Sequence, residues 1–376
     1  MLRVLMTADT IGGMWNYTLD LARGLAAHDV KIILATMGAP LSRDQHVELE
    51  ELGDAVDLHE SDFRLEWMDD PWTDVTAAGD WLLSLERDLQ PDLVHLNGYA
   101  HGALPFRVPK LVVAHSCVIS WWRAVKNTPP PPTWARYHTA VRLGLDQANL
   151  IVAPSHAMLA SLHRNYGFSC GARVIYHGRD FPAQTPPASP AKQPAILSVG
   201  RLWDEARNAA TLASAAARLP WPVRIAGDTR APHGSSALPP SFPNVELLGR
   251  RTNADLHREY QRASIYALPA RYEPFGLSVL EAALHGCALV LADIPSLREI
   301  WAGSAVFVPP NNAPALRDEL ADLIDDPYRL QALGALAQRR ARSFSVARMT
   351  ETYLATYAEL LSPARRPAAA FTASFA

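Results

Sequence analysis

The feature that most constrains the fold of this chain is a regular alternation of short apolar runs with helical patterns. Apolar runs occur at residues 2–7, 30–36, 93–96 and 111–114, and segments with helical periodicity separate them. Short runs that are apolar throughout are typical of parallel strands, which are buried on both faces of their sheet. The alternation therefore predicts a Rossmann-like α/β/α architecture, in which ligands bind beyond the carboxyl ends of the strands.

A proline-rich segment divides the alternation into two parts. Residues 182–194 contain five prolines and no periodicity, which is typical of an interdomain linker. The sequence thus predicts a first domain over residues 1–181 and a second domain over residues 195–344. A last helix is expected over residues 345–362, and its return to the first domain stays open. The alanine-rich tail, residues 363–376, is expected to be disordered.

Charge and cysteine content limit the class of protein. The formal net charge of −3 gives no reason to expect a nucleic-acid partner. No apolar run approaches the length of about 20 residues that a transmembrane helix needs, and the N-terminal residues read as a strand rather than a signal peptide. The three cysteines lack metal-ligand spacing and are expected to be free thiols. We expect a cytoplasmic protein, with contact to the inner face of the membrane left open.

One segment of the second domain places two carboxylates around a helix start. Glu273 stands before a predicted helix and Glu281 stands inside it. Pro274 disfavours helical backbone at Glu273, and Gly276 permits a sharp turn and close approach of a ligand. The N–H groups of residues 277–279 are then free at the helix start, where they favour an anion. This combination suits a phosphate joined to polyhydroxyl groups, such as a nucleotide sugar.

A second motif carries two arginines on the loop after the expected strand at residues 195–199. Arg201 and Arg207 flank this loop, at the end of the sheet where ligands bind. Two permanent cations on one loop match a diphosphate, which arginine can bind through two hydrogen bonds at once. The alternative is a pair of solvated surface arginines. We favour the diphosphate site because the loop lies in the same domain as the two carboxylates.

These two motifs together carry a resemblance to a known family. GRLWDEARN at residues 200–208, followed by EPFGLSVLE at residues 273–281, resembles the second domain of retaining GT-B glycosyltransferases of family 4, the glycosyl transferases group 1. TIGGM at residues 10–14 and YHGRD at residues 176–180 resemble the family's glycine-rich loop and its interdomain turn, so the resemblance covers nearly the whole chain. It implies the GT-B fold, in which two Rossmann-like domains face each other across a cleft.

The resemblance also implies roles for individual residues. Glu281 would accept hydrogen bonds from both ribose hydroxyls, and Glu273 would accept one from a hydroxyl of the donor sugar. Arg201 and Arg207 would neutralise the departing diphosphate, so that no metal or other cofactor is required. His115 would donate a hydrogen bond to the sugar or phosphate, unless it is only a core residue. The other implied donor-binding residues are Gly12, Gly13, Arg251, Phe275, Gly276, Leu277 and Ser278.

The chain departs from the family pattern at two of these motifs. Arg207 stands where the family usually has Lys, which keeps the charge but places the hydrogen-bond donors differently. His177 stands where Asn is usual, with no consequence that the sequence reveals. For the two carboxylates the alternatives are structural: a capping or ion-paired Glu281 and an exposed Glu273.

An aromatic and basic cluster in the first domain is a candidate for acceptor binding. Trp121, Trp122, Arg123 and Lys126 follow His115 closely in the sequence. Aromatic faces stack on sugar rings, and basic groups bind phosphate or lipid head groups. We expect an acceptor-binding loop here, and the alternative is a buried cap over the sheet.

The leading hypothesis for the chain is an enzyme that transfers a hexose from a nucleotide-diphosphate sugar to a saccharide or lipid-linked acceptor. As in the family, retention of anomeric configuration and a place in polysaccharide or glycoconjugate biosynthesis are implied. The alternatives are a nucleotide-sugar epimerase of the same fold and a catalytically silent sugar-nucleotide-binding module. A dinucleotide dehydrogenase is disfavoured, because no GxGxxG follows a strand. The base, the sugar, the acceptor and the oligomeric state stay open.

Overall fold

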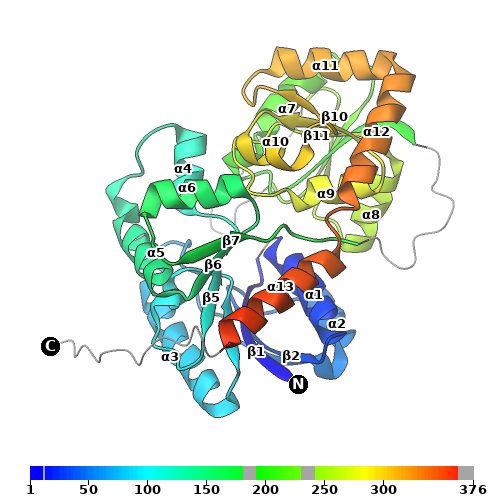
Figure 1. Ribbon diagram of the computed structural model, residues 1–376. Coiled ribbons are helices and arrows are strands. Elements are labelled where there is room, and N and C mark those ends of the chain that lie inside the picture. Colours follow the sequence, from blue (N-terminus) through cyan, green and yellow to red (C-terminus); the bar gives the residue numbers. More distant parts are fainter. Residues whose placement is uncertain (12, 181–191, 230–241, 363–376) are drawn as a thin grey trace.

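The computed structural model describes residues 1–11, 13–180, 192–229 and 242–362, and Figure 1 shows them as two stacked α/β lobes. Within these ranges the lower lobe contains a seven-stranded sheet in the order β3-β2-β1-β4-β5-β6-β7. The upper lobe contains a six-stranded sheet in the order β10-β9-β8-β11-β12-β13. The strand pairs of both sheets are parallel, from β1 with β2 to β12 with β13. The prediction of two Rossmann-like domains is confirmed.

The first domain alternates strands and helices from its first residues. Its elements are β1 (Leu2–Asp9), α1 (Met14–Ala26), β2 (Val30–Met37), α2 (Arg43–Glu50), β3 (Val56–Glu60), α3 (Trp72–Leu89), β4 (Leu93–Leu96), β5 (Lys110–Val113), α4 (Val118–Lys126), α5 (Ala135–Gln147), β6 (Leu150–Ala153), α6 (His156–Tyr166) and β7 (Gly171–Val174). Three short 3-10 helices lie among them, η1 (Gly53–Ala55), η2 (Ala100–Ala103) and η3 (Pro132–Trp134).

The second domain repeats this alternation and ends in three helices. Its elements are β8 (Gln193–Val199), η4 (Glu205–Arg207), α7 (Ala209–Ala216), β9 (Val223–Ala226), β10 (Val245–Gly249), α8 (Asn253–Arg262), β11 (Ala263–Leu268), α9 (Leu277–Leu284), β12 (Ala288–Ala292), α10 (Pro295–Trp301), β13 (Val306–Val308), α11 (Ala313–Asp325), α12 (Pro327–Ala341) and α13 (Val346–Leu361).

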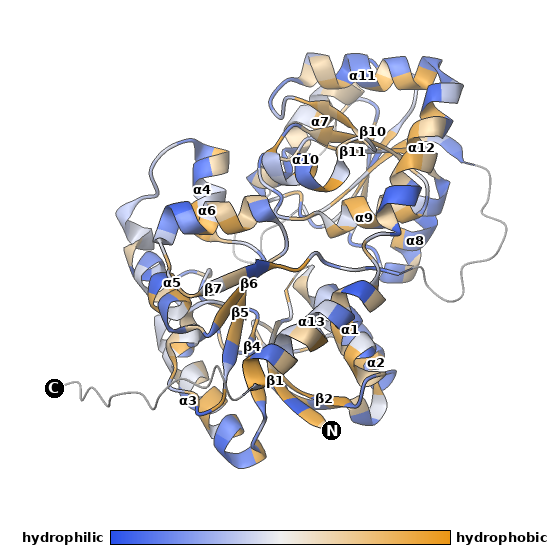
Figure 2. Cartoon of the chain, in the orientation of Figure 1, coloured by the Kyte–Doolittle hydropathy of each residue, from blue (hydrophilic) through white to orange (hydrophobic). Residues whose placement is uncertain are grey.

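Alternate side chains of the strands enter two separate cores, because successive residues point to opposite faces of a sheet. In β1, Val4 and Met6 pack in the cluster that contains α1. Leu5 packs on the other face, in the cluster that contains Val141 of α5. Figure 2 shows the resulting pattern, with hydrophobic strands in the interior and helices that are hydrophilic on their outer sides. Burial on both faces explains why the strands read as continuous apolar runs.

The last helix, α13, lies against the first domain although it follows the second domain in sequence. Figure 1 shows α13 beside α1. Tyr353 and Tyr357 are fully buried in the first-domain core. Tyr353 accepts a hydrogen bond from the hydroxyl of Tyr17 at 2.7 Å, and Tyr357 lies 2.7 Å from Nδ1 of His95. The two domains are therefore joined by α13 as well as by the chain between β7 and β8.

Two expected boundaries need correction or fall outside the described residues. The linker was expected to run to residue 194, but β8 begins at Gln193, which pairs with Ala263 of β11. The carbonyl of Gln193 also accepts a hydrogen bond from the Ser264 hydroxyl at 2.6 Å. The final residues of the expected linker thus belong to the sheet. The rest of the linker up to residue 191, and the tail at 363–376, lie outside the described residues.

Candidate active site

A cavity of about 810 Å³ lies between the two domains. Its lining comes from the carboxyl ends of strands in both sheets, where ligands bind in folds of this kind. Asp9 is the last residue of β1, His115 lies just after β5, and Arg201 lies just after β8. Both Glu273 and Glu281 also line it. The structure therefore brings the carboxylates, the arginines and His115 of the sequence analysis to one cavity.

Glu273 forms an ion pair with Arg207 inside the second domain. The carboxylate is buried at 7% exposure, so the alternative of an exposed loop glutamate is wrong. Burial alone would lower the pKa of the Arg207 guanidinium, but the charge of Glu273 outweighs it and raises that pKa. The Nε atom of Arg207 is buried and has no partner among the described residues. Arg207 thus holds Glu273 and keeps one donor unused.

Arg201 is the second cation of the same loop. Its Nη2 lies 3.2 Å from Oδ2 of Asp204, and its guanidinium lies 5.2 Å from the ring centre of Trp203. Burial and the like charge of Arg207 lower the pKa of Arg201. Two partly buried cations that repel each other are stabilised by an anion placed near both. The loop is therefore electrostatically suited to a diphosphate.

The start of α9 offers backbone N–H groups to the same cavity. Gly276 stands at the N-cap with φ of 93°, a conformation that favours glycine, and a Cβ there would lie 3.0 Å from Val279. Leu277 and Ser278 occupy the first two helical positions, whose N–H groups have no partner within the helix. The expectation that Val279 is also free is wrong, because its N–H donates to the Gly276 carbonyl at 3.0 Å. Two N–H groups, rather than three, can face an anion.

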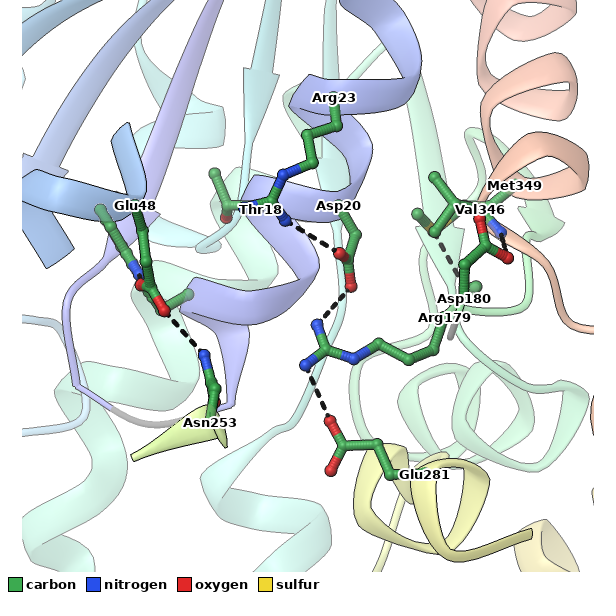
Figure 3. Close-up of polar contacts among 12 residues, drawn as sticks. Thr18, Asp20, Arg23, Glu48, Arg179, Asp180, Asn253, Glu281, Val346 and Met349 are labelled. Carbon is green, nitrogen blue, oxygen red and sulfur yellow. Dashed lines mark hydrogen bonds and ion pairs between the residues drawn. The ribbon is translucent and has the colours of Figure 1, made fainter. Parts of the chain in front are cut away.

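Glu281 is held by Tyr260 of its own domain and by Arg179 of the interdomain turn. The hydroxyl of Tyr260 donates to its Oε2 at 3.0 Å, and Nη2 of Arg179 lies 3.1 Å from its Oε1. Arg179 also donates through Nη1 to Oδ2 of Asp20 on α1, at 2.7 Å. Figure 3 shows Arg179 between the two carboxylates, which come from different domains. Glu281 is ion-paired, as its structural alternative held, and it also lines the cavity.

Arg179 was missed by the sequence analysis although its motif was noted. It is buried at 9% exposure and stands in the turn that resembles the family's Asn-Gly-Val-Asp. A charged residue in place of the family's Val was the available signal. The neighbouring His177 also differs from the family, and its ring stacks on His115 with centroids 5.2 Å apart. Both departures therefore make contacts at the site.

His115 lines the cavity with both ring nitrogens near partners. Its Nε2 lies 2.8 Å from Oδ1 of Asn97, and its Nδ1 lies 3.4 Å from Nε2 of His177. The side-chain amide of Asn97 donates to the Thr7 carbonyl, so its oxygen faces His115 as an acceptor. Burial and the neighbouring histidines lower the pKa of His115 well below its usual value. The ring is neutral, and its donation to a sugar or phosphate stays a prediction.

The aromatic and basic cluster of the first domain is a helix, α4, and not the expected loop. Trp121 and Trp122 line the cavity, whereas Arg123 is exposed and outside the lining. The indole of Trp121 donates to Oδ1 of Asp204 at 2.8 Å, and Nζ of Lys126 donates to Glu205 at 2.6 Å. The helix therefore reaches across the cleft to the arginine loop.

The glycine-rich loop and Arg251 complete the predicted site. Gly13 and Arg251 line the cavity, whereas Gly12 lies outside the described residues. Asp9, which the sequence analysis did not single out, also lines it. Burial raises the pKa of Asp9 to about 7, against the effects of a hydrogen bond from Ile11 and the charge of Arg201. An acidic residue at the end of the first strand was the signal for it.

The described residues contain neither a metal-binding cluster nor a membrane-spanning helix. Within the described ranges no group of three or more His, Cys, Asp or Glu side chains is arranged to hold a metal ion. Among the described helices, none combines the length and apolar character that crossing a bilayer requires. The metal-independent reaction expected from the sequence stays a prediction.

Comparisons with known proteins agree with this architecture. Residues 11–181 match Glycosyltransferase Family 4, and residues 193–326 match Glycosyl transferases group 1. The chain belongs to the family 4 glycosyltransferases. It is 26% identical to a glycogen synthase of Mycobacterium tuberculosis over 373 residues, covering 89% of this chain and 86% of the relative. It is 25% identical to a D-inositol 3-phosphate glycosyltransferase of Corynebacterium efficiens, covering 93% and 90%.

Solved structures confirm the GT-B fold of this glycosyltransferase. A sucrose-phosphate synthase from Thermosynechococcus elongatus superposes with a TM-score of 0.79 at 19% identity, covering 96% of this chain and 99% of that one. Anabaena HepE in complex with UDP-glucose superposes with a TM-score of 0.74 at 17% identity, covering 96% and 100%. The prediction of a family 4 glycosyltransferase with two facing Rossmann-like domains is confirmed.

Proposed function

We propose that this glycosyltransferase transfers a hexose from a nucleotide-diphosphate sugar to a saccharide or lipid-linked acceptor, with retention of anomeric configuration. The observation that carries the proposal is the meeting of Glu273, Glu281, Arg201 and Arg207 at one cavity walled by both domains. Carboxylates suit the hydroxyl groups of ribose and hexose, and the arginines suit the diphosphate between them. A donor that joins all three groups matches this arrangement.

In the proposed reaction the arginine loop stabilises the leaving group. The bond from the anomeric carbon to the donor phosphate breaks while a bond to the acceptor oxygen forms on the same face. The acceptor proton passes to the departing diphosphate, so no protein nucleophile is needed. Negative charge grows on the diphosphate near Arg201, Arg207 and the N-terminus of α9, which stabilise it increasingly towards the transition state. These fixed charges can supply the electrostatic stabilisation, which supports a metal-independent reaction.

The named relatives support the choice of donor and setting. One solved neighbour is Anabaena HepE in complex with UDP-glucose, and a curated relative is a glycogen synthase. UDP-glucose is therefore the first donor to test, and polysaccharide or glycoconjugate biosynthesis is the proposed setting. Cys117, Cys170 and Cys287 are free thiols, in keeping with a cytoplasmic location.

The deciding experiment incubates the protein with UDP-, GDP- and ADP-sugars and measures the nucleotide released, with and without added saccharides. Transfer that depends on an acceptor supports the proposal. Release of an epimerised sugar without an acceptor indicates an epimerase, and nucleotide binding without release indicates a silent module. NMR of the first product reports the anomeric configuration, and an inverted product contradicts retention. Activity lost in EDTA and restored by Mg²⁺ contradicts metal independence.

A further inference from the structure

We infer that the first-domain wall of the cavity binds an uncharged, unphosphorylated saccharide as acceptor, and that Asp9 accepts a hydrogen bond from one of its hydroxyl groups. This inference rests on the proposed function, because it specifies the acceptor class for the same cavity. It is based on the aromatic lining of this wall, on the polar partners that Arg64 and Lys126 already have, and on the position of Asp9.

Aromatic side chains form much of the first-domain wall. On this side the cavity is lined by Trp67, Tyr99, Trp121, Trp122, Trp134 and Tyr137. The rings of Trp121 and Trp122 lie 6.1 Å apart, and those of Trp134 and Tyr137 lie 5.7 Å apart. Aromatic faces pack against the apolar C–H faces of sugar rings. The wall thus suits a saccharide more than an anionic group.

Arg64 and Lys126 of this domain already have polar partners. Arg64 is the one Lys or Arg side chain that the described part of the first domain contributes to the lining. It donates to the Asp69 carbonyl at 3.4 Å, and its Nε lies 3.8 Å from Asp74. Lys126, at the edge of the wall, pairs with Glu205 at 2.6 Å. An acceptor phosphate would therefore share either cation with an existing partner.

The histidines of the wall add no positive charge. Burial lowers the pKa of His101, whose Nε2 lies 2.9 Å from the Val75 carbonyl. Burial also lowers the pKa of His115 well below its usual value. Both rings are therefore neutral near pH 7, and neither offers a phosphate the charge-assisted hydrogen bond that a cation would give.

Asp9 places a carboxylate on this wall instead. Its side chain lies at the end of β1 with 7% exposure, and its Oδ1 accepts the Ile11 N–H at 2.6 Å. The Trp67 side chain also donates to it. Burial raises its pKa to about 7, so the ionised form is the major one above neutral pH. An ionised carboxylate accepts a hydrogen bond from a hydroxyl group and repels a phosphate.

The opposite wall has the reverse character. Arg201, Arg207, Arg250 and Arg251 of the second domain line the cavity. An anionic group that enters the cavity is attracted to these residues, because the field of clustered like charges favours the opposite sign. A phosphorylated acceptor would compete with the donor diphosphate for this wall rather than bind opposite it. The four arginines therefore mark the donor side of the cavity, while aromatic rings and the carboxylate of Asp9 mark the acceptor side.

The test compares acceptors in pairs that differ by one phosphate, such as maltose with maltose 6-phosphate and methyl glucoside with its 6-phosphate. The donor is the nucleotide sugar from which the protein releases nucleotide. We expect kcat/KM to be at least about tenfold higher for the uncharged member, with the phosphorylated member inhibiting competitively against the donor. A preference for the phosphorylated member overturns the inference. Failure of the proposed function looks different, because no donor then releases nucleotide.

A pair of variants ties the discrimination to Asp9. Asp9→Asn should lower kcat/KM for the uncharged acceptor about tenfold, and should lower acceptor affinity more than nucleotide affinity. It should also bring the kcat/KM values of the uncharged and phosphorylated acceptors closer together, because the charge that repels the phosphate is removed. Asp62→Asn is the matched control, since Asp62 is exposed and outside the cavity lining, and it should change neither value. If Asp9→Asn leaves the ratio of kcat/KM for uncharged and phosphorylated acceptors unchanged, Asp9 does not select the acceptor.

Discussion

The two glutamates of the donor motif are held in opposite ways, although both are buried in one cavity. Glu273 pairs with Arg207, which belongs to the same domain. Glu281 pairs with Arg179 of the interdomain turn, at 3.1 Å, and Arg179 pairs in turn with Asp20 of α1 at 2.7 Å. One carboxylate is thus oriented by the second domain alone, and the other is tied to the first domain.

This difference links Glu281, but not Glu273, to the arrangement of the two domains. A rotation of the domains is expected to move Arg179 relative to either Asp20 or Glu281, because those residues lie in different domains. The pair of Glu273 and Arg207 is expected to move as one unit. Figure 3 shows a second contact across the domains, in which Asn253 donates to Glu48 at 2.7 Å. Glu281, the carboxylate proposed to bind ribose, is therefore expected to respond to domain orientation.

The largest expected effect comes from breaking the pair at Glu273. Arg207→Ala removes a cation from the diphosphate site and leaves Glu273 without its partner. Removing one such electrostatic donor costs about 3 kcal/mol of barrier, so kcat should fall about a hundredfold or more. Steady-state transfer kinetics measure this. Arg258→Ala, at an exposed arginine outside the cavity lining, is the control. A loss below about fivefold contradicts the role of Arg207.

A smaller effect is expected at the Glu281 side, from the arginine that spans the domains. Arg179→Met should weaken binding of the free nucleotide diphosphate about tenfold, because the orientation of Glu281 is lost. In a Glu281→Ala background the same substitution should add little, since both act through one carboxylate. Titration calorimetry on the four proteins closes this cycle, with thermal melts as a folding check. Equal losses in both backgrounds show that Arg179 acts independently of Glu281.

Asp9 extends the comparison, because this carboxylate of the cavity lining has no ion pair among the described residues. Its folded pKa of about 7 lies above the usual 3.8, so the folded state binds the proton more tightly than the unfolded state. Stability from this group is present below pH 4 and is lost as the pH rises to about 7. Asp9→Asn should therefore raise Tm by a few degrees at pH 8 and leave it unchanged at pH 4. Equal Tm shifts at both pH values would contradict the conclusion that the Asp9 carboxylate is buried and lacks an ion pair.

The smallest expected effect lies away from both glutamates, at α4. Trp122→Ala removes an aromatic face from the cavity lining, and acceptor KM should rise about threefold to tenfold. Nucleotide affinity should stay the same, because the indole of Trp122 hydrogen-bonds Thr128 on its own domain, at 3.2 Å. An unchanged acceptor KM in a normally folded protein removes Trp122 from the site.

The sequence predicts those parts of the structure that depend on local pattern. The alternation of apolar runs and helical segments predicts both parallel sheets, because strands that are buried on both faces must be apolar throughout. The spacing of Glu273 and Glu281 around Gly276 predicts a turn and a helix start, which depend on a few adjacent residues. The linker boundary was placed too late, since composition does not reveal that Gln193 pairs with Ala263 in the sheet.

The contacts that the sequence does not predict join residues that are far apart along the chain. Asp20, Arg179 and Glu281 meet only because the turn after β7 passes between α1 and α9. Trp121 hydrogen-bonds Asp204 across the cleft because the two domains face each other there. This contact shows that α4 is more than an open acceptor loop. Pairing of this kind depends on the relative placement of the two domains, which no local pattern encodes.

The most direct test of this account measures the affinity of free nucleotide for Glu281→Ala and Glu273→Ala by titration calorimetry, with UDP, GDP and ADP as ligands. We expect Glu281→Ala to weaken nucleotide binding about tenfold or more. Glu273→Ala should keep or tighten the affinity, because the freed Arg207 can pair with the diphosphate, while transfer is lost. If both variants lose nucleotide affinity equally, the division of roles between the two carboxylates is contradicted.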